Sequence, residues 1–146
     1  QNFGANKHYR INTAINYSIV LSGLWGLVVS IPLLIFQKQF SSLFSADFLV
    51  KEYLVEYIKI ISISYIFWGW SNIASAAFNG YQKPLTATFI YLSRLFIITI
   101  PLVIIGNYFY GLNGIFLGIM ISNILSGILS IMYVKNSNVL NAIIRN

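Results

Sequence analysis

A set of polar and aromatic side chains recurs at steps of three and four in the apolar stretch between residues 60 and 84. These residues are Ser64, Trp68, Ser71, Asn72, Ser75 and Asn79. In an α-helix this spacing places them on one face. Hydroxyl and amide groups find no hydrogen-bond partner among lipid tails, so this face must meet other helices or a water-filled cavity.

Two interpretations fit the candidate residues of this stretch, Tyr65, Trp68, Asn72 and Ser75. Aromatic faces attract organic cations and amides orient polar groups, so a transport cavity lined by these residues is the first. A hydrogen-bonded seam between helices, worth about 0.6 kcal/mol per contact, is the second. The sequence leaves both open. Trp70 points away from this face, and we expect it to pack against protein or to face lipid.

Arg94 interrupts the apolar segment 85–105 and is the fifth candidate site residue. Counted from Pro84 it lies about 15 Å along a helix, close to the bilayer midplane. A charge there costs about 2.5–3.5 kcal/mol, so we expect water or a partner. One interpretation is a functional charge that meets an acid on another helix or an anionic lipid group. The other is a structural arginine that leans toward the membrane surface and binds loop carbonyls.

The residues needed for enzymatic chemistry are missing from the sequence. The chain has one histidine (His8), no cysteine, and three acids that all lie between residues 47 and 56. It also lacks a phosphate-binding loop, so neither acid–base nor covalent catalysis has its groups. We therefore expect no enzyme activity, no cofactor and no metal site.

The composition is that of a polytopic membrane protein. Of the 146 residues 58% are hydrophobic and 8% are charged, and the mean hydropathy is +0.76. Soluble domains carry about a quarter charged residues. The net charge of +6 comes from lysines and arginines scattered along the chain, which argues against a nucleic-acid partner.

Four transmembrane helices are predicted from uncharged length and turn signals. They cover residues 12–37, 46–79, 85–105 and 113–134. The second is expected to be one long helix with Ser45 as its N-cap, and residues 106–112 are expected to form an interfacial turn. Small residues also repeat at every fourth position, which lets helices approach closely. These residues are Ser18, Ser22, Gly26 and Ser30 in the first helix, and Gly114, Gly118, Ser122, Ser126 and Ser130 in the last.

The basic residues predict the orientation. Lys7, Arg10, Lys83, Lys135 and Arg145 fall on one side of the four helices. Lys38, Lys51 and Lys59 fall on the other side, mixed with the acids. Because lysine and arginine mark the cytoplasmic side, both ends of the chain are expected there, with the helices in antiparallel up-down order.

Two turns on the expected cytoplasmic side resemble the MATE (multidrug and toxin extrusion) family of transporters. The run Gln1-Asn2-Phe3-Gly4-Ala5-Asn6-Lys7, followed by Arg10, is similar to the QNxGA…R loop ahead of the ninth of twelve helices. The run Phe78-Asn79-Gly80-Tyr81-Gln82-Lys83-Pro84 is similar to the FNGxGKP turn after the tenth helix, with Gln82 in place of a common glycine. That replacement leaves the backbone shape of the turn open. The run Leu43 to Asp47 resembles the family's LFT-D segment.

The resemblance implies the last four helices of the C-terminal lobe of a twelve-helix, two-lobe transporter in the inner or plasma membrane. It implies secondary active multidrug efflux by alternating access, with sodium ions or protons exchanged for organic cations. Membrane lipid and the remaining helices of a longer chain are further implied partners. Because the chain begins at Gln1 in a loop-like stretch, we expect a C-terminal fragment that does not transport alone.

The resemblance also bears on the position of the site for the coupling ion. Some family members carry an acidic cation site partly on the tenth helix, whereas the comparable face here offers Tyr65, Trp68 and Asn72. Any coupling carboxylate is therefore expected outside these four helices.

Two alternatives remain open from the sequence. A flippase for lipid-linked oligosaccharides belongs to the same superfamily, but its more cationic cavity finds support only in Arg94. A purely structural membrane subunit explains the small-residue repeats, but it leaves the polar aromatic face and Arg94 unexplained. In a full-length sequence, an acid in the first helix would favour cation exchange and a cluster of arginines would favour a flippase.

Overall fold

The computed structural model describes residues 2–5 and 7–137, and its regular elements are helices. The predicted positions Gln1, Asn6 and Arg145 lie outside the described residues. In chain order the elements are α1 (His8–Ile35), α2 (Gln37–Phe44), α3 (Phe48–Ile61), the 3-10 segment η1 (Ser62–Ser64), α4 (Tyr65–Gly80), α5 (Pro84–Ser93), the π-helical segment η2 (Arg94–Thr99) and α6 (Ile100–Asn136).

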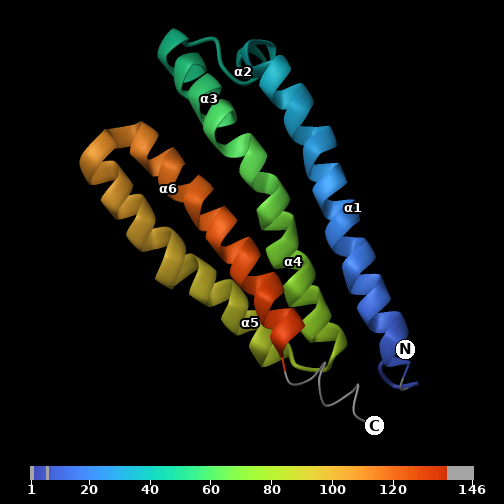
Figure 1. Cartoon of the computed structure of the whole chain (residues 1–146). Helices are drawn as coiled ribbons and strands as arrows, with labels where there is room; N and C mark the ends of the chain where they lie inside the picture. Colours follow the sequence, from blue (N-terminus) through green and yellow to red (C-terminus); the bar gives the residue numbers. More distant parts are fainter. Residues whose placement is uncertain (1, 6, 138–146) are drawn as a thin grey trace.

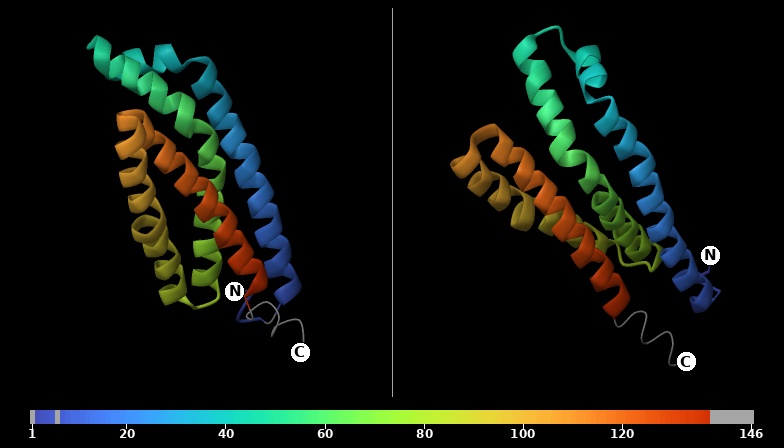
Figure 2. Two further views of the ribbon diagram at one scale, coloured as in Figure 1. Left: turned by 60° about the vertical axis from the view of Figure 1, so that its left-hand side comes forward. Right: turned by 45° about the horizontal axis from the view of Figure 1, so that its top comes forward.

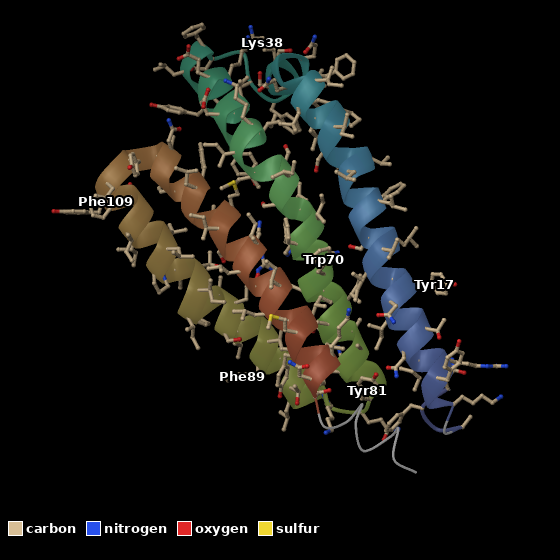
Figure 3. The ribbon with its side chains drawn as sticks, viewed as in Figure 1. Tyr17, Lys38, Trp70, Tyr81, Phe89 and Phe109 are labelled. Atoms are coloured by element: carbon tan, nitrogen blue, oxygen red, sulfur yellow. The ribbon has the colours of Figure 1, made fainter. Side chains whose placement is uncertain are left out.

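The elements form a bundle of long helical rods (Figure 1). One rod is α1, a second is α3 continued through η1 into α4, and a third is α5 continued through η2 into the first part of α6. The second part of α6 is the fourth rod. Figures 1 and 2 place the start of α1, the α4–α5 turn and the end of α6 at one end of the bundle. The short helix α2 lies at the opposite end, where Figure 3 labels Lys38.

Two helical segments have the length and apolarity of membrane spans. They are Tyr9–Ile35 and Pro84–Asn136, and an 18-residue window of each has a mean hydropathy of 2.2. Only 6% of each window is buried inside the bundle, so most of their large apolar side chains point outward. Outward-facing apolar surface of this extent is typical of helices that lie in lipid.

The predicted single helix over residues 46–79 is wrong in its beginning and in its middle. The helix begins at Phe48, and its N-cap is Asp47 rather than Ser45. The Asp47 Oδ1 atom accepts hydrogen bonds from the backbone N–H groups of Leu49 (2.8 Å) and Val50 (3.2 Å). A carboxylate satisfies these free N–H groups and also interacts favourably with the positive end of the helix dipole.

In its middle the same rod is interrupted by η1, where 3-10 geometry replaces the α-helical hydrogen-bond pattern. Serine hydroxyls take over the freed carbonyl groups. Ser30 of α1 donates to the Ser62 carbonyl oxygen (2.6 Å), and Ser64 donates to the Ile61 carbonyl oxygen (2.7 Å). These serines are buried, so η1 depends on hydroxyl groups that lipid tails could not replace.

Two predicted connections also differ from the structure. The stretch between the first two predicted helices contains the helix α2, and the turn over residues 106–112 is reduced to Gly111. The helix continues to Tyr110, and Gly111 then adopts φ 56° and ψ −136°. A residue with a side chain rarely adopts this conformation, whereas glycine adopts it readily. One residue is therefore enough to reverse the chain between the third and fourth rods (Figure 1).

The small-residue repeats lie where helices touch, as the packing interpretation predicts. A Cβ atom added to Gly26 of α1 would lie 3.0 Å from Ile66 Cα in α4. A Cβ atom on Gly114 would overlap the backbone carbonyl of Gly106 across the α6 reversal, and the same holds in the other direction. These contacts bring backbones closer together than larger side chains would allow.

The turn after α4 closes with the left-handed residue at Gln82. Its φ is 58°, while Asn79 and Gly80 remain helical. The Lys83 N–H donates to the Phe78 carbonyl (2.9 Å), and the Gln82 N–H donates to the Asn79 carbonyl (3.0 Å). This pair of bonds is a Schellman motif, in which glycine usually takes the left-handed position. The position where the sequence has glutamine in place of a glycine thus keeps a glycine-like backbone.

Candidate functional site

Arg94 lies at the first position of the π-helical segment η2, midway along the third rod. In η2 the backbone N–H of Ile100 donates to the carbonyl of Leu95, five residues earlier. The Thr99 hydroxyl donates to the Arg94 carbonyl oxygen (2.9 Å), and the Ser122 hydroxyl of α6 donates to Thr99. Side chains thus stabilise the irregular backbone from within and from α6. Short π-helical segments of this kind are frequent at functional sites.

The guanidinium of Arg94 is linked to η1 through one amide. The Arg94 Nη2 atom donates to Asn123 Oδ1 (2.8 Å), and Asn123 Nδ2 donates to the Ser64 hydroxyl (3.0 Å). Asn123 is 4% exposed and Ser64 is completely buried. We call Ser64, Asn123 and Arg94 the polar junction. It connects the two helix interruptions, η1 and η2, through Asn123 of α6. The amide oxygen of Asn123 accepts one hydrogen bond, and its NH₂ group donates the other.

An aromatic pair borders the polar junction. The Arg94 Cζ atom lies 5.8 Å from the centroid of the Trp68 ring, within the range of a cation–π contact. Trp68 is 42% exposed, and its ring centroid lies 6.1 Å from that of Tyr65. The Tyr65 hydroxyl lies 3.4 Å from the Tyr57 hydroxyl. The structure therefore brings together three of the predicted site residues, Tyr65, Trp68 and Arg94.

Among the described residues, no acidic side chain pairs with Arg94. The three acids of the sequence are Asp47, Glu52 and Glu56, and they lie toward the α2 end of the bundle. Within the described residues the Arg94 Nε atom is buried and has no hydrogen-bond partner. A pocket of about 220 Å³ borders Arg94 between α5–η2 and α6. Phe89, Ser126 and Tyr133 are among its other lining residues.

The other two predicted site residues lie farther along α4. Asn72 is exposed and follows Trp68 by one helical turn. Ser75 is half-buried, and its hydroxyl lies 3.4 Å from the Ala87 carbonyl oxygen of α5, so it belongs to a helix–helix seam. Trp70 packs against protein, since its Nε1 atom donates to the Ile19 carbonyl of α1 (3.2 Å). Figure 3 shows its side chain between α4 and α1.

Asn123 is the residue that sequence reasoning missed. It stands beside Ser122, inside the small-residue repeat of the last predicted helix, and we singled out only the repeat. An amide in the middle of an apolar span needs a partner for the same reason that Arg94 does. That shared need was a usable signal, because two polar groups at mid-span on neighbouring helices are natural partners.

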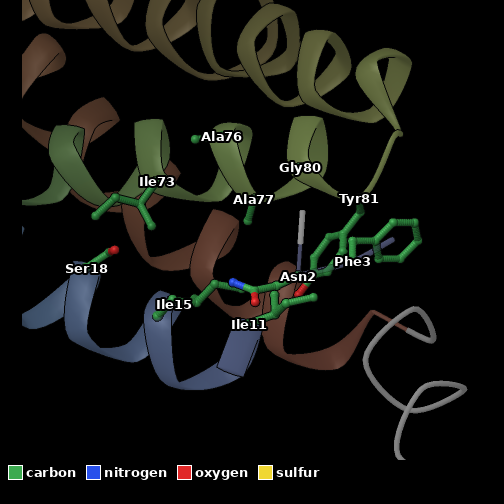
Figure 4. Close-up of a pocket in the computed structure, with 11 residues that line it drawn as sticks. Asn2, Phe3, Ile11, Ile15, Ser18, Ile73, Ala76, Ala77, Gly80 and Tyr81 are labelled. Atoms are coloured by element: carbon green, nitrogen blue, oxygen red, sulfur yellow. The ribbon is translucent and has the colours of Figure 1, made fainter. Parts of the chain in front are cut away.

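A larger pocket, about 350 Å³, lies at the end of the bundle that holds the N-terminal segment. Figure 4 shows it between the start of α1 and the end of α4, with Phe3 beside Tyr81. The centroids of the two rings are 5.8 Å apart, and burial raises the pKa of Tyr81 above its ordinary value. Its lining is apolar or uncharged, and it offers less for binding an ionic solute than the polar junction does.

Comparisons with known proteins agree with the fold. The MatE family model matches residues 1–105. A protein named FAD transporter from Shewanella oneidensis is 34% identical over 128 residues, which are 88% of this chain and 28% of that protein. This chain therefore spans less than a third of the length of that relative.

Solved structures are similar along nearly the whole chain. The Vibrio cholerae MATE transporter VcmN, in its bent form, has a TM-score of 0.92 at 22% identity, over 97% of this chain and 32% of that one. An inward-facing multidrug resistance transporter of the MATE family has a TM-score of 0.91 at 19% identity, over 99% of this chain and 34% of that one. At these identities the structures support the all-helical membrane fold alone. Together with the family match they confirm the resemblance predicted from the two turns, and the chain belongs to the MATE family of membrane transporters.

Proposed function

We propose that this chain forms part of one lobe of a secondary active transporter that moves organic solutes across the cell membrane by alternating access. The polar junction is the observation that carries the proposal. It puts a guanidinium about halfway along a membrane-length rod, in contact with an exposed tryptophan. Because a charge at this depth is costly, such residues usually mark a solute or ion pathway.

In this proposal the chain supplies the last four helices of a twelve-helix, two-lobe protein, and they cross the inner or plasma membrane in alternating directions. The end of the bundle that carries the α4–α5 turn is also the end of Lys7, Lys83 and Lys135. Lysine-rich ends mark the cytoplasmic side, so both ends of the chain are assigned to the cytoplasm.

Single cysteines test this orientation. Cysteines at Lys7, Lys83 and Ser137 should react with a membrane-impermeant reagent only from the cytoplasm, and cysteines at Ser42 and Asn113 only from outside. Asn113 lies two residues after the reversal at Gly111 and is exposed, which makes it a suitable reporter of the outer side. Labelling of positions 83 and 42 from the same side would exclude alternating crossings.

The proposed energy source is an exchange with sodium ions or protons. This chain has no acid along the third and fourth rods, and its acids lie in the first part of the second rod. A sodium ion binds oxygen ligands such as carboxylates, and a coupled proton needs a titratable group such as a carboxyl. The proposal therefore assigns the coupling carboxylate to other helices of a longer protein, and this chain mainly contributes solute contacts.

Two classes of solute are compatible with a MATE transporter built from these residues. Organic cations are the class that the family resemblance implies, and the faces of Tyr65 and Trp68 would attract them. A flavin nucleotide is the second class. It is favoured by the name of the Shewanella relative and by the uncompensated positive charge of Arg94. Planar aromatic members of both classes suit an exposed tryptophan.

The two alternative functions receive less support. A flippase for lipid-linked oligosaccharides would need several cations for the pyrophosphate, and Arg94 is the basic residue found at mid-depth in this chain. A purely structural subunit would have its polar groups paired, yet the Arg94 Nε atom has no partner among the described residues. Both alternatives predict no gradient-driven flux of small aromatic solutes.

Reconstitution of the full-length protein tests the proposal. In proteoliposomes, an imposed sodium or proton gradient should drive flux of ethidium or of flavin mononucleotide, and dissipating the gradient should stop it. The 146-residue chain alone should insert without transporting, because it spans less than a third of the length of its relative. Flux from the isolated chain, or none from the full-length protein under either gradient, would refute the proposal.

A further inference from the structure

We propose that Arg94 is the anion-recognition residue of the transport site, and that the solute carries a phosphate or carboxylate group attached to a planar ring system. This inference rests on the proposed function and names its substrate class. Its support lies in the unmet hydrogen bonds of Arg94, in the way Asn123 holds the guanidinium, and in the space around it.

Most hydrogen-bond donors of Arg94 have no partner among the described residues. A guanidinium has N–H groups on three nitrogens and accepts no hydrogen bonds. Among the described residues, Arg94 donates one side-chain hydrogen bond, to the uncharged amide oxygen of Asn123. Its Nε atom is unpaired, and its charge has no carboxylate partner along these rods. Phosphates and carboxylates are the groups that bind a guanidinium through two parallel hydrogen bonds.

Asn123 fixes the orientation of the Arg94 guanidinium. The Ser64 hydroxyl donates to the Ile61 carbonyl, so it can only accept from Asn123. This fixes the NH₂ end of the Asn123 amide toward Ser64 and its oxygen toward Arg94. Asn123 is thus a positioning residue that holds Arg94 without neutralising it. A fixed cation that keeps its charge can bind an anion with little reorganisation.

A small pocket borders Arg94. The pocket beside Arg94 has a volume of about 220 Å³, which is small beside the roughly 300–1,000 Å³ of typical ligand sites. It is large enough for the anionic group of a solute but not for a whole dinucleotide. Trp68 is not among the lining residues of this pocket. It is 42% exposed and contacts Arg94 separately, so it offers an aromatic face on which a planar ring can stack.

Arg94 and Trp68 together disfavour an organic cation. Arg94 already occupies the cation–π position of Trp68, at 5.8 Å from the ring centroid. A cationic solute would have to displace the guanidinium and would also meet its repulsion in a medium of low dielectric constant. An anionic solute gains from both features, because it leaves the Arg94–Trp68 contact in place and adds the missing countercharge.

Binding of two flavins to the purified full-length protein tests the inference. Flavin mononucleotide and riboflavin share one ring system and differ by a phosphate. We expect the wild-type protein to bind the phosphorylated flavin at least about tenfold more tightly, as a charge-assisted hydrogen bond predicts. Arg94→Gln should lower that affinity to the level of riboflavin, while the affinity for riboflavin changes by less than about twofold.

Asn123→Asp separates recognition from structure. The change preserves the shape of the side chain and gives Arg94 a carboxylate partner. It also removes the N–H donor to Ser64, whose hydroxyl can turn from the Ile61 carbonyl to the new carboxylate, so the loss in stability should be small. A purely structural arginine would then be held about as well, and binding of both flavins would be retained. We expect instead that the melting temperature is maintained while the preference for the phosphorylated flavin is lost. The matched control is Lys38→Gln, which removes an equal charge at the exposed α2 end and should leave the preference unchanged.

The inference is overturned if the preference survives in Arg94→Gln or in Asn123→Asp. It is also overturned if Arg94→Gln weakens both flavins equally in a protein with an unchanged melting temperature. If Arg94→Gln does not fold, Asn123→Asp decides alone. Flavin preference without gradient-driven flux would refute the proposed transport but leave anion recognition standing. Flux of ethidium or riboflavin without any phosphate preference would refute anion recognition but leave the proposed transport standing.

Discussion

The contact between α1 and α4 and the polar junction are both buried meetings of helices, but they are built in opposite ways. At the first, small residues such as Gly26 bring two helices close enough for backbone contact. At the second, Asn123 and Arg94 meet beside two interrupted helices and leave a charge uncompensated. The first arrangement maximises packing, whereas the second sacrifices regular helix geometry to hold polar groups. This difference separates a structural contact from a candidate site.

The largest effect is expected from breaking the close contact. In Gly26→Ala the new methyl group would press on the Ile66 backbone at 3.0 Å, and overpacking of this kind costs about 1–3 kcal/mol. Reversible unfolding in mixed micelles measures the loss. Gly23→Ala is the matched control, because its methyl group would meet only the Trp70 Nε1 atom at an ordinary 3.9 Å. Equal effects of the two alanines would contradict the close-contact assignment.

Removing the charge from the junction should have a large effect on transport and little on stability. Arg94→Leu removes an insertion cost of about 2.5–3.5 kcal/mol, so the protein should insert and accumulate normally. We expect it to lose most of its transport in proteoliposomes. Arg94→Lys should recover only part of the activity, because a point charge does not reproduce the planar donor pattern of a guanidinium. Full transport by Arg94→Leu would show that the junction is dispensable.

The bond between Ser64 and Asn123 should be worth less than the close contact. A double-mutant cycle with Ser64→Ala and Asn123→Ala isolates this pair, whose atoms lie 3.0 Å apart. Hydrogen bonds between membrane helices average about 0.6 kcal/mol, and we expect a coupling energy of that size. A coupling above about 2 kcal/mol would mean that the junction is primarily a stabilising element and not a candidate site.

The smallest effect is expected at a site outside both regions. Gln82 has a left-handed backbone, which costs about 1–2 kcal/mol for a residue with a side chain, while glycine loses more entropy on folding. Gln82→Gly should therefore stabilise the protein by about 0.5 kcal/mol. This gain should add to the effect of Ser64→Ala, since distant sites without shared partners act independently. A strongly non-additive result would link the turn to the junction.

The regular parts of this molecule were predictable from sequence, and the interruptions were not. Hydropathy placed helices within a few residues of α1 and of the second part of α6, because long apolar runs have few alternatives in lipid. Small residues at four-residue spacing correctly predicted close packing at Gly26 and Gly114.

By contrast, η1 and η2 leave no local mark in the sequence. Besides local hydroxyl bonds, they are joined by a group distant along the chain, since Asn123 is 59 residues from Ser64 and 29 from Arg94. For the same reason the sequence did not predict which of the candidate residues lie together. Tyr65, Trp68 and Arg94 are neighbours, whereas Ser75 turned out to face a helix seam.

The reversal at Gly111 has a consequence for biogenesis. It joins the rod that carries Arg94 to the rod that carries Asn123 through a single residue, and Gly106 and Gly114 bring the two backbones together just beside it. A hairpin this tight can leave the translocon as one unit, with the arginine already bound to its amide partner. The guanidinium would then enter the membrane already bonded to its amide partner, which would lower the cost of inserting a charged residue.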